Sequence, residues 1–220
     1  MKNVIYFILV SLLVFTSCKK NSNPTSPSED TSTVTYSGKV YHTLKIGNQT
    51  WLKENLDVGT MIQGTTNSSN NGVIEKYCYN NDPIFCKSFG GFYQWDEAMQ
   101  YATSEKTQGI CPKDWHIPTI SEFETLKSTV NNDCNVLKAE GQGAEGGVGT
   151  NTSGYSALLV GRRFDNGSFE QLFYETFFWS SEEGDSLGAY NMGLWSMGND
   201  LTKFRDSKKS GFNIRCIKDN

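Results

Sequence analysis

The sequence predicts an α+β domain with two helices and an antiparallel, loop-rich second half. Only two segments place apolar side chains at helical spacing. Many short stretches instead have the period of two that is typical of strands, and turn-forming residues separate them. Two helices beside many short strands are typical of the α+β class.

The size and composition of the chain favour a single folded domain. The 220 residues are 37% hydrophobic and 13% aromatic, and they carry a net charge of −4. This aromatic content excludes a disordered chain, and the negative charge gives no electrostatic reason to bind nucleic acid. After removal of an N-terminal export segment, the remaining length suits one domain, which we place at residues 34–220.

Residues 1–17 have the pattern of a signal peptide. Lys2 precedes an apolar run over residues 4–15, which is too short to span a hydrocarbon core of about 30 Å. Small residues then lead directly into Cys18, in a pattern that resembles a bacterial lipobox. We expect cleavage before Cys18 and its acylation, which would anchor the protein to a membrane. The alternative is an ordinary signal peptide followed by an incidental cysteine.

Residues 18–33 are expected to hold the lipidated cysteine and a flexible tether. Ser, Thr, Asn and Pro are frequent in this stretch, and it has no large apolar side chain with which to form a core. The expected location is a bacterial cell envelope, at an outer membrane or the cell surface. The sequence leaves open which leaflet holds the anchor.

The first elements of the domain form a predicted hairpin. Residues 40–46 have a period of two, and Gly47-Asn48 then turns the chain into residues 49–52. Residues 57–76 are rich in Gly, Asn, Ser and Thr, and we expect them to form a long loop.

Two helices are predicted in the middle of the chain. Apolar residues recur at helical spacing from Phe92 to Ala102, which predicts a helix over residues 93–103. Thr119 and Glu122 have the spacing of a capping box, which predicts a second helix over residues 120–131.

The chain beyond Gly141 is expected to contain short strands and turns. Asp165-Asn166-Gly167 is the clearest hairpin turn, between residues 162–164 and 168–170. Further strand candidates are residues 174–181, 189–197 and 212–217.

Five cysteines remain besides Cys18, in a compartment that permits disulfides. A bond between Cys78 and Cys86 could close a turn-rich loop, and a bond between Cys111 and Cys216 would tie the middle of the domain to its end. Other pairings are open at this point. A zinc site is excluded because the cysteines lack the close spacing of such sites and the chain has only two histidines.

Seven segments combine aromatic, glycine and cysteine residues in a distinctive order. They are Ile46-Gly-Asn-Gln-Thr-Trp51 with Glu54-Asn55-Leu56, Cys78-Tyr-Asn-Asn-Asp82, Gly91-Phe-Tyr-Gln-Trp95, Gly109-Ile-Cys-Pro112 with Trp115-His-Ile-Pro118, Gly154-Tyr-Ser-Ala-Leu158, Trp179-Ser-Ser-Glu182 and Gly211-Phe-Asn-Ile-Arg-Cys216. In this order, over residues 38–218, they resemble the Fibrobacter succinogenes major paralogous domain, a family of exported bacterial proteins. Two of them are also similar to the formylglycine-generating sulfatase activators, whose fold is C-type-lectin-like.

The resemblance implies two helices that frame a mixed, mostly antiparallel β core. It also implies the disulfides Cys78–Cys86 and Cys111–Cys216, because these four cysteines lie in matched motifs and Cys134 does not. Cys134 would then be a free thiol. The resemblance carries over no established biochemical activity.

The candidate groups for catalysis are two histidines and Cys134. We expect His116 to be structural because it lies between Trp115 and Ile117 just before a helix cap, and His42 to be structural because it lies on a strand. The reactive Ser-Tyr-Cys motif of the sulfatase activators is absent. We expect no catalysis and no resident cofactor, and an enzyme related to those activators, using Cys134, is the alternative hypothesis.

Glu182, Glu183 and Asp185 place three carboxylates within four positions. Such a group could hold a calcium ion together with loop carbonyls. The alternative is a solvated acidic turn. The loop motifs with which C-type lectins bind sugar through calcium are absent.

Four tryptophans lie inside the matched motifs and are expected to be core: Trp51, Trp95, Trp115 and Trp179. Trp195 lies among glycines and polar residues, and we expect it to be exposed and to stack on a ligand with Tyr190. Loops on a rigid scaffold often carry recognition. We therefore predict a lipid-anchored, non-catalytic binding or scaffold domain. It would present the first recognition loop (residues 141–153) and the second (residues 182–200) to a glycan or an envelope protein.

Overall fold

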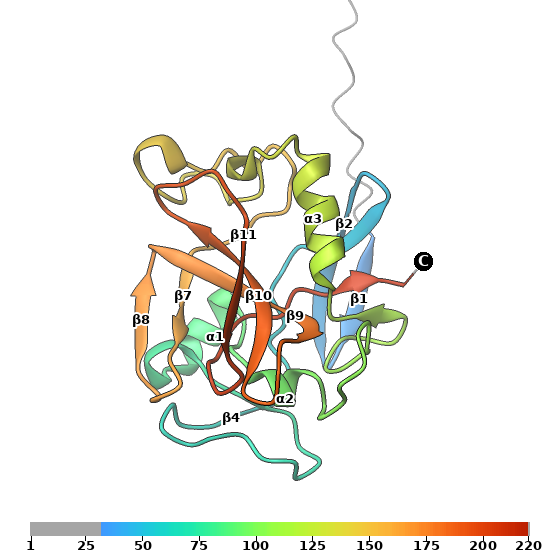
Figure 1. Ribbon diagram of the computed structural model, residues 1–220, viewed down its shortest axis with the longest axis vertical. Coiled ribbons are helices and arrows are strands. Elements are labelled where there is room, and N and C mark those ends of the chain that lie inside the picture. Colours follow the sequence, from blue (N-terminus) through green and yellow to red (C-terminus); the bar gives the residue numbers. More distant parts are fainter. Residues whose placement is uncertain (1–31, 220) are drawn as a thin grey trace, which may run out of the picture.

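The computed structural model describes residues 32–219 (Figure 1). The predicted signal peptide, Cys18 and nearly all of the predicted tether lie outside the described residues. The tether was expected to extend through residue 33, but the first strand begins at Thr33. No helix within residues 32–219 combines the length and the hydrophobicity that a membrane crossing requires.

The first sheet has five strands, all paired in antiparallel fashion, in the order β1-β2-β3-β12-β6. Their bounds are Thr33–Tyr36 for β1, Lys39–Ile46 for β2, Gln49–Leu52 for β3, Trp115–His116 for β6 and Ile217–Lys218 for β12. The predicted hairpin at Gly47-Asn48 is confirmed as β2–β3. Because β12 lies between β3 and β6, the C-terminal end of the domain is held inside this sheet.

The second sheet also has five strands, in the order β11-β10-β9-β7-β8. Their bounds are Val160–Arg163 for β7, Phe169–Leu172 for β8, Glu175–Glu183 for β9, Gly188–Trp195 for β10 and Thr202–Ser207 for β11. Within this sheet only β7 and β9 pair in parallel, so the core is mixed and mostly antiparallel, as predicted. The hairpin at Asp165-Asn166-Gly167 is confirmed as β7–β8.

Three strand assignments differ between the sequence prediction and the structure. Strand β11 is not predicted from the sequence, because the side chains of this edge strand are polar or exposed and lack an apolar alternation. Residues 212–217 were expected to form a strand, but Phe212 and Asn213 make only isolated bridges and regular pairing begins at Ile217. Within the predicted loop 57–76, β4 (Thr60–Met61) and β5 (Glu75–Lys76) form a short parallel pair.

The described chain has three α-helices rather than the two predicted: α1 (Pro83–Phe89), α2 (Trp95–Ala98) and α3 (Ile120–Thr129). Short 3-10 segments lie at Tyr79–Asn81, Cys134–Val136 and Glu145–Gly147. Helix α3 begins at the predicted capping box, in which Thr119 Oγ1 accepts from Glu122 N at 3.1 Å and Glu122 accepts from Thr119 N at 2.9 Å.

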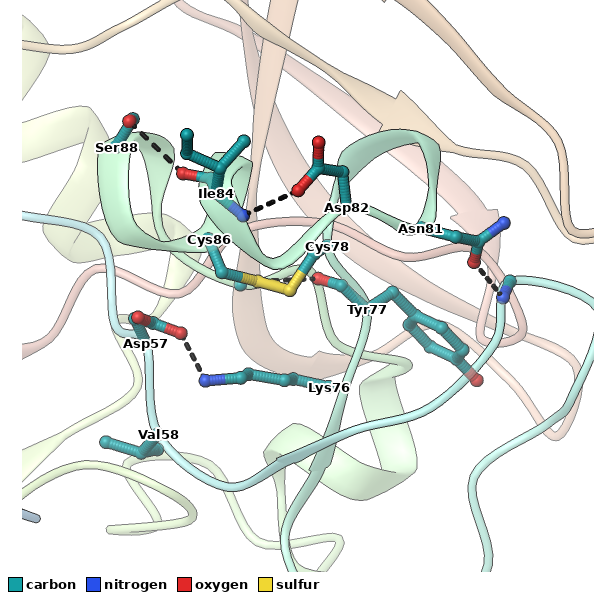
Figure 2. Close-up of a disulfide and its surroundings, with 12 residues drawn as sticks. Asp57, Val58, Lys76, Tyr77, Cys78, Asn81, Asp82, Ile84, Cys86 and Ser88 are labelled. Atoms are coloured by element: carbon teal, nitrogen blue, oxygen red, sulfur yellow. Dashed lines mark hydrogen bonds and ion pairs between the residues drawn. A yellow bond between two sulfur atoms is a disulfide. The ribbon is translucent and has the colours of Figure 1, made fainter.

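The predicted helix over residues 93–103 is wrong beyond Ala98. Gln100 and Tyr101 have φ angles of 51° and 60°, in the left-handed region, so the helical path ends there. Helix α1 was missed, although its local signals are present. Asp82 caps it by accepting from Ile84 N at 2.9 Å (Figure 2). Pro83 occupies the first turn.

The core lies between the two sheets and beside α3, which stands next to the blue strands in Figure 1. One cluster joins Trp51 of β3 to Phe123 of α3 and Phe178 of β9. The four tryptophans of the matched motifs are at most 4% exposed, which confirms that they belong to the core. Both disulfides have the predicted partners, Cys78–Cys86 and Cys111–Cys216, and Cys134 is free and buried.

Candidate functional site

A buried lysine holds the two predicted recognition loops together. Lys138 is fully buried. Its ammonium group donates to the carbonyl oxygen of Gly147 in the first recognition loop and to those of Trp195, at 2.9 Å, and Gly198, at 2.7 Å, in the second. Hydrogen bonds from one side chain therefore hold the two loops together, whereas their glycine content predicts flexible segments.

Tyr190 and Trp195 do not form a common stacking surface. They lie an odd number of positions apart on β10, so their side chains point to opposite faces of the sheet. The Tyr190 ring lies 3.8 Å from Lys203 Nζ. The expected exposure of Trp195 is wrong, because its ring is partly buried and packs edge-on against Phe177 and Phe204, with centroids 5.5 and 5.2 Å away.

The three carboxylates predicted as a calcium site bind separate partners. Glu182 accepts from Ile120 N at 2.7 Å, at the start of α3. The partners of Glu183 and Asp185 are Lys208 and Arg205, respectively. Residues 32–219 contain no group of three or more His, Cys, Asp or Glu side chains placed to hold a metal ion. The structure therefore does not bring these three carboxylates together around one point.

His116 and Cys134 are enclosed by other groups. His116 Nδ1 lies 2.6 Å from Asp219 Oδ1, and its Nε2 lies 3.0 Å from Glu122 Oε1. Burial opposes the charge on His116, but hydrogen bonds with the two carboxylates outweigh it and raise the pKa of the imidazole. Burial raises the pKa of the Cys134 thiol to about 11, so the thiol is protonated at neutral pH.

A cleft of about 340 Å³ lies beside the Cys78–Cys86 disulfide and includes neither His116 nor Cys134 in its lining. The start of β2, the segment that follows β3 and the C-terminal half of α1 form three of its walls. Segments far apart in the sequence complete it, including Ser156, Leu158 and Arg215. Its volume is in the range of small-molecule sites.

One wall of the cleft contains a buried ion-pair network around Asp57. The Asp57 side chain is 7% exposed and pairs with both Lys39 and Lys76. Figure 2 shows Lys76 reaching Asp57 next to the disulfide. Burial and the positive charges of Lys76 and Lys87 lower the pKa of Lys39. The lysines around Asp57 therefore repel one another, and one carboxylate does not balance them.

Arg215 adds a buried cation to the lining. The residue is 1% exposed, and Nε and Nη2 donate to Asn55 Oδ1 at 3.1 and 2.6 Å, while Nη1 donates to the Tyr155 carbonyl oxygen. Its ring-stacking partner is Tyr155, whose centroid lies 4.5 Å from the guanidinium carbon. No carboxylate within residues 32–219 forms an ion pair with Arg215.

No pattern in the sequence predicts this cleft, although two of the quoted motifs contain the contact between Asn55 and Arg215. Asn55 follows Glu54 in the first motif, and Arg215 precedes Cys216 in the last. The two residues are 160 positions apart, and no periodicity indicates that their side chains meet. The available signal was the presence of an arginine and an asparagine in motifs otherwise expected to be core.

Comparison with known proteins identifies one family. The model described as the Fibrobacter succinogenes major domain matches residues 44–218, which covers all walls of the cleft except the start of β2. No curated protein and no solved structure matches the chain. The C-type-lectin-like architecture therefore stays a prediction from the motifs, while the α+β class is established by the fold itself.

Proposed function

The chain belongs to the Fibrobacter succinogenes major domain family, and we propose that this member is a non-catalytic binding domain of a bacterial cell envelope. A lipid on Cys18 would hold it on an outer membrane or at the cell surface. Its ligand would be a glycan, bound in the cleft beside the Cys78–Cys86 disulfide. The two recognition loops of the second half are not the binding surface in this proposal.

The cleft is the single observation that carries this proposal. A concave site of about 340 Å³ suits a sugar unit or a glycan chain end. A protein partner would instead need a contact surface of about 800 Å² on each side. The Cys78–Cys86 disulfide closes the chain around one wall, and Arg215 joins two distant segments in another, so the cleft is a preorganised one.

The state of the Cys134 thiol argues against the enzyme alternative. A nucleophilic cysteine needs access to substrate and a lowered pKa. Cys134 is fully buried, its thiol pKa is raised to about 11, and it lies outside the lining of the cleft. His116 is held between two carboxylates and does not line the cleft either.

The membrane anchor is tested by replacing the acylated residue. Wild-type protein and Cys18→Ala are compared by cell fractionation, and the mature N-terminus is analysed by mass spectrometry. We expect wild type in the membrane fraction with lipid on Cys18, and release of the variant. A wild-type N-terminus that is cleaved but carries no lipid would contradict the anchor.

The binding site is tested with full-length protein in detergent on a glycan array. Ser88 of α1 lines the cleft and is exposed, so Ser88→Trp fills the cleft with little effect on folding. Ile84 lies on the same helix, is 60% exposed and does not line the cleft, so Ile84→Trp is the matched control. We expect wild type and Ile84→Trp to bind the same glycans and Ser88→Trp to lose them. Equal binding by both variants would place the ligand elsewhere, and an array without any bound glycan would overturn the proposal.

A further inference from the structure

The cleft concentrates positive charge in a chain whose net charge is −4. Four cationic side chains line it, and only two acidic ones do. The cations are Lys39, Lys53, Lys87 and Arg215, and the acids are Glu54 and Asp57. An excess of one sign of charge in a cleft focuses the electrostatic field and attracts ligands of the opposite sign.

Both acidic side chains of the lining already have partners. Asp57 pairs with Lys39 and Lys76. Glu54 accepts from the backbone N of His42 at 2.8 Å, and its other oxygen lies 2.7 Å from the His42 ring. Neither Lys53 nor Lys87 forms an ion pair with any other residue of the described chain. The positive charges of these two ammonium groups are therefore not balanced by an ion pair.

The buried guanidinium of Arg215 points to the same ligand charge. Three of its five N–H groups donate to neutral oxygens of Asn55 and Tyr155. A cation that is 1% exposed is ordinarily paired with a carboxylate, because burial of an unpaired charge is unfavourable. Within residues 32–219 no carboxylate forms an ion pair with Arg215, although the charge of Glu54 acts on it from a distance and opposes the lowering of its pKa by burial. A ligand anion in the cleft would add to this compensation.

The neutral polar groups of the lining are occupied by the protein. Asn55 uses its oxygen for Arg215 and donates through Nδ2 to the Phe89 carbonyl at 2.9 Å. The hydroxyl of Ser88 donates to the Ile84 carbonyl, and that of Ser156 donates to Asn151. The lining therefore offers ammonium groups and a guanidinium more readily than the neutral donors and acceptors that recognise sugar hydroxyls.

We propose that the cleft binds an anionic sugar, whose carboxylate or sulfate group is held by Lys53 and Lys87 in the field of the buried Arg215. This inference rests on the proposed function, because it specifies which glycans enter the cleft. The apolar side chains of Val40, Phe89 and Leu158 also line the cleft and provide contact area for the body of the sugar. A charge-assisted hydrogen bond from each lysine would make the cleft prefer anionic sugars to neutral ones.

Calorimetry with the full-length protein in detergent tests the inference through matched ligands. The probes are trigalacturonate, its fully methyl-esterified form, which keeps the same sugar chain without the charges, and a sulfated galactose trisaccharide. We expect at least one anionic probe to bind about 10-fold or more tightly than the ester, since one charge-assisted hydrogen bond has about that effect. We also expect this affinity to fall as the salt concentration rises. The two anionic probes distinguish carboxylate from sulfate.

Matched variants test the site. Lys53→Gln/Lys87→Gln removes two charges from the cleft and should weaken binding of the anionic probe by about 10-fold or more. Lys113→Gln/Lys218→Gln removes the same charge from exposed positions outside the lining and should change binding less than about 2-fold. Thermal unfolding of each variant checks that it is folded, and Lys87→Gln alone gives a second, milder variant at an exposed position.

The possible outcomes separate this inference from the proposed function. Binding of the ester as tightly as the acid, with loss in Ser88→Trp, would overturn the anionic specificity and leave a glycan-binding cleft. Binding of an acidic hexapeptide in the cleft, without any sugar, would overturn both the glycan and the inference. Anion binding that Lys53→Gln/Lys87→Gln leaves unchanged would show that these lysines are not the site.

Discussion

Two regions of this domain, the pair of recognition loops and the cleft, each contain a buried cation. Lys138 donates to three carbonyl oxygens and is enclosed by the two recognition loops. Arg215 also donates only to neutral oxygens, but it lines an open cleft together with other cations. A buried cation surrounded by backbone carbonyls holds segments of the chain together, whereas a buried cation at a cleft adds its positive charge to the electrostatic field inside the cleft.

The same comparison explains why glycine content was a poor guide to recognition. A Cβ atom at Gly147 would lie 2.1 Å from the Ser196 carbonyl oxygen. The glycine therefore allows the two recognition loops to approach each other closely, and Lys138 then holds them in place. At Gly147 the absence of a side chain therefore serves close packing rather than flexibility.

The largest expected effect comes from removing the lysine that fastens the loops. Lys138→Met keeps a side chain of similar length but leaves three carbonyl oxygens, one buried and two partly buried, without this donor. We expect a loss of about 3–5 kcal/mol in the free energy of unfolding, measured by denaturant titration. Lys113→Met, at an exposed position, is the control. A loss below about 1 kcal/mol would mean that the loops are not fastened by this residue.

The disulfide beside the cleft should have a smaller effect on stability and a specific effect on binding. Removing Cys78–Cys86, with a sequence separation of 8, should lower the free energy of unfolding by about 2.5 kcal/mol through the entropy of the unfolded chain. Because Cys86 lines the cleft, Cys78→Ser/Cys86→Ser should also weaken glycan binding, whereas Lys138→Met should leave it less affected. Unchanged glycan affinity in the cysteine variant would show that this disulfide does not shape the binding site.

The variant Trp195→Ala tests whether the Trp195 ring belongs to an exposed binding surface or to the packed interior. The ring of Trp195 contacts Phe177 and Phe204 and is partly buried. We expect a loss of about 2 kcal/mol in the free energy of unfolding, below the usual range for a fully buried tryptophan, and no change in glycan binding. The opposite pattern, with stability preserved and binding lost, would restore the recognition role that the sequence analysis assigned to Trp195.

His116 differs from Lys138 and Arg215 because its buried cationic side chain has carboxylate partners. Replacing it should have the smallest effect on the free energy of unfolding. The raised pKa of His116 means that its stabilising contribution is complete below the unfolded pKa of about 6.5 and is lost as the pH rises through the folded pKa. Burial alone would raise the pKa of Glu122, but hydrogen bonds from His116 and Thr119 N lower it to about 2, so its contribution is lost only as the pH falls from about 4.5 toward 2.

We therefore expect His116→Gln to lower the free energy of unfolding by about 1 kcal/mol between pH 4.5 and 6.5, and by less at higher pH. Thermal unfolding of both proteins between pH 4 and 9 measures the difference. A difference that grows with pH would contradict a charged His116 between Glu122 and Asp219.

Several features of this protein follow from local signals in the sequence. The capping box at Thr119 and the turns at Gly47-Asn48 and Asn166-Gly167 act within a few residues, and the structure has each of them where it was predicted. Burial of the motif tryptophans was also predictable, because large apolar surfaces are removed from water in almost any compact fold. The resemblance to a family predicted both disulfides.

Tertiary structure decided the rest, because the deciding contacts join distant residues. The Asn55–Arg215 contact spans 160 positions, and the bond from Lys138 to Gly198 spans 60, so no periodicity in the sequence contains them. The opposite orientation of Tyr190 and Trp195 depended on their membership of one strand, which the chemistry of the two rings does not indicate. The sequence by itself determined the family, the disulfides and the locally encoded elements. The position of the cleft and its charge were decided by long-range packing, which places cations from separate segments together in space.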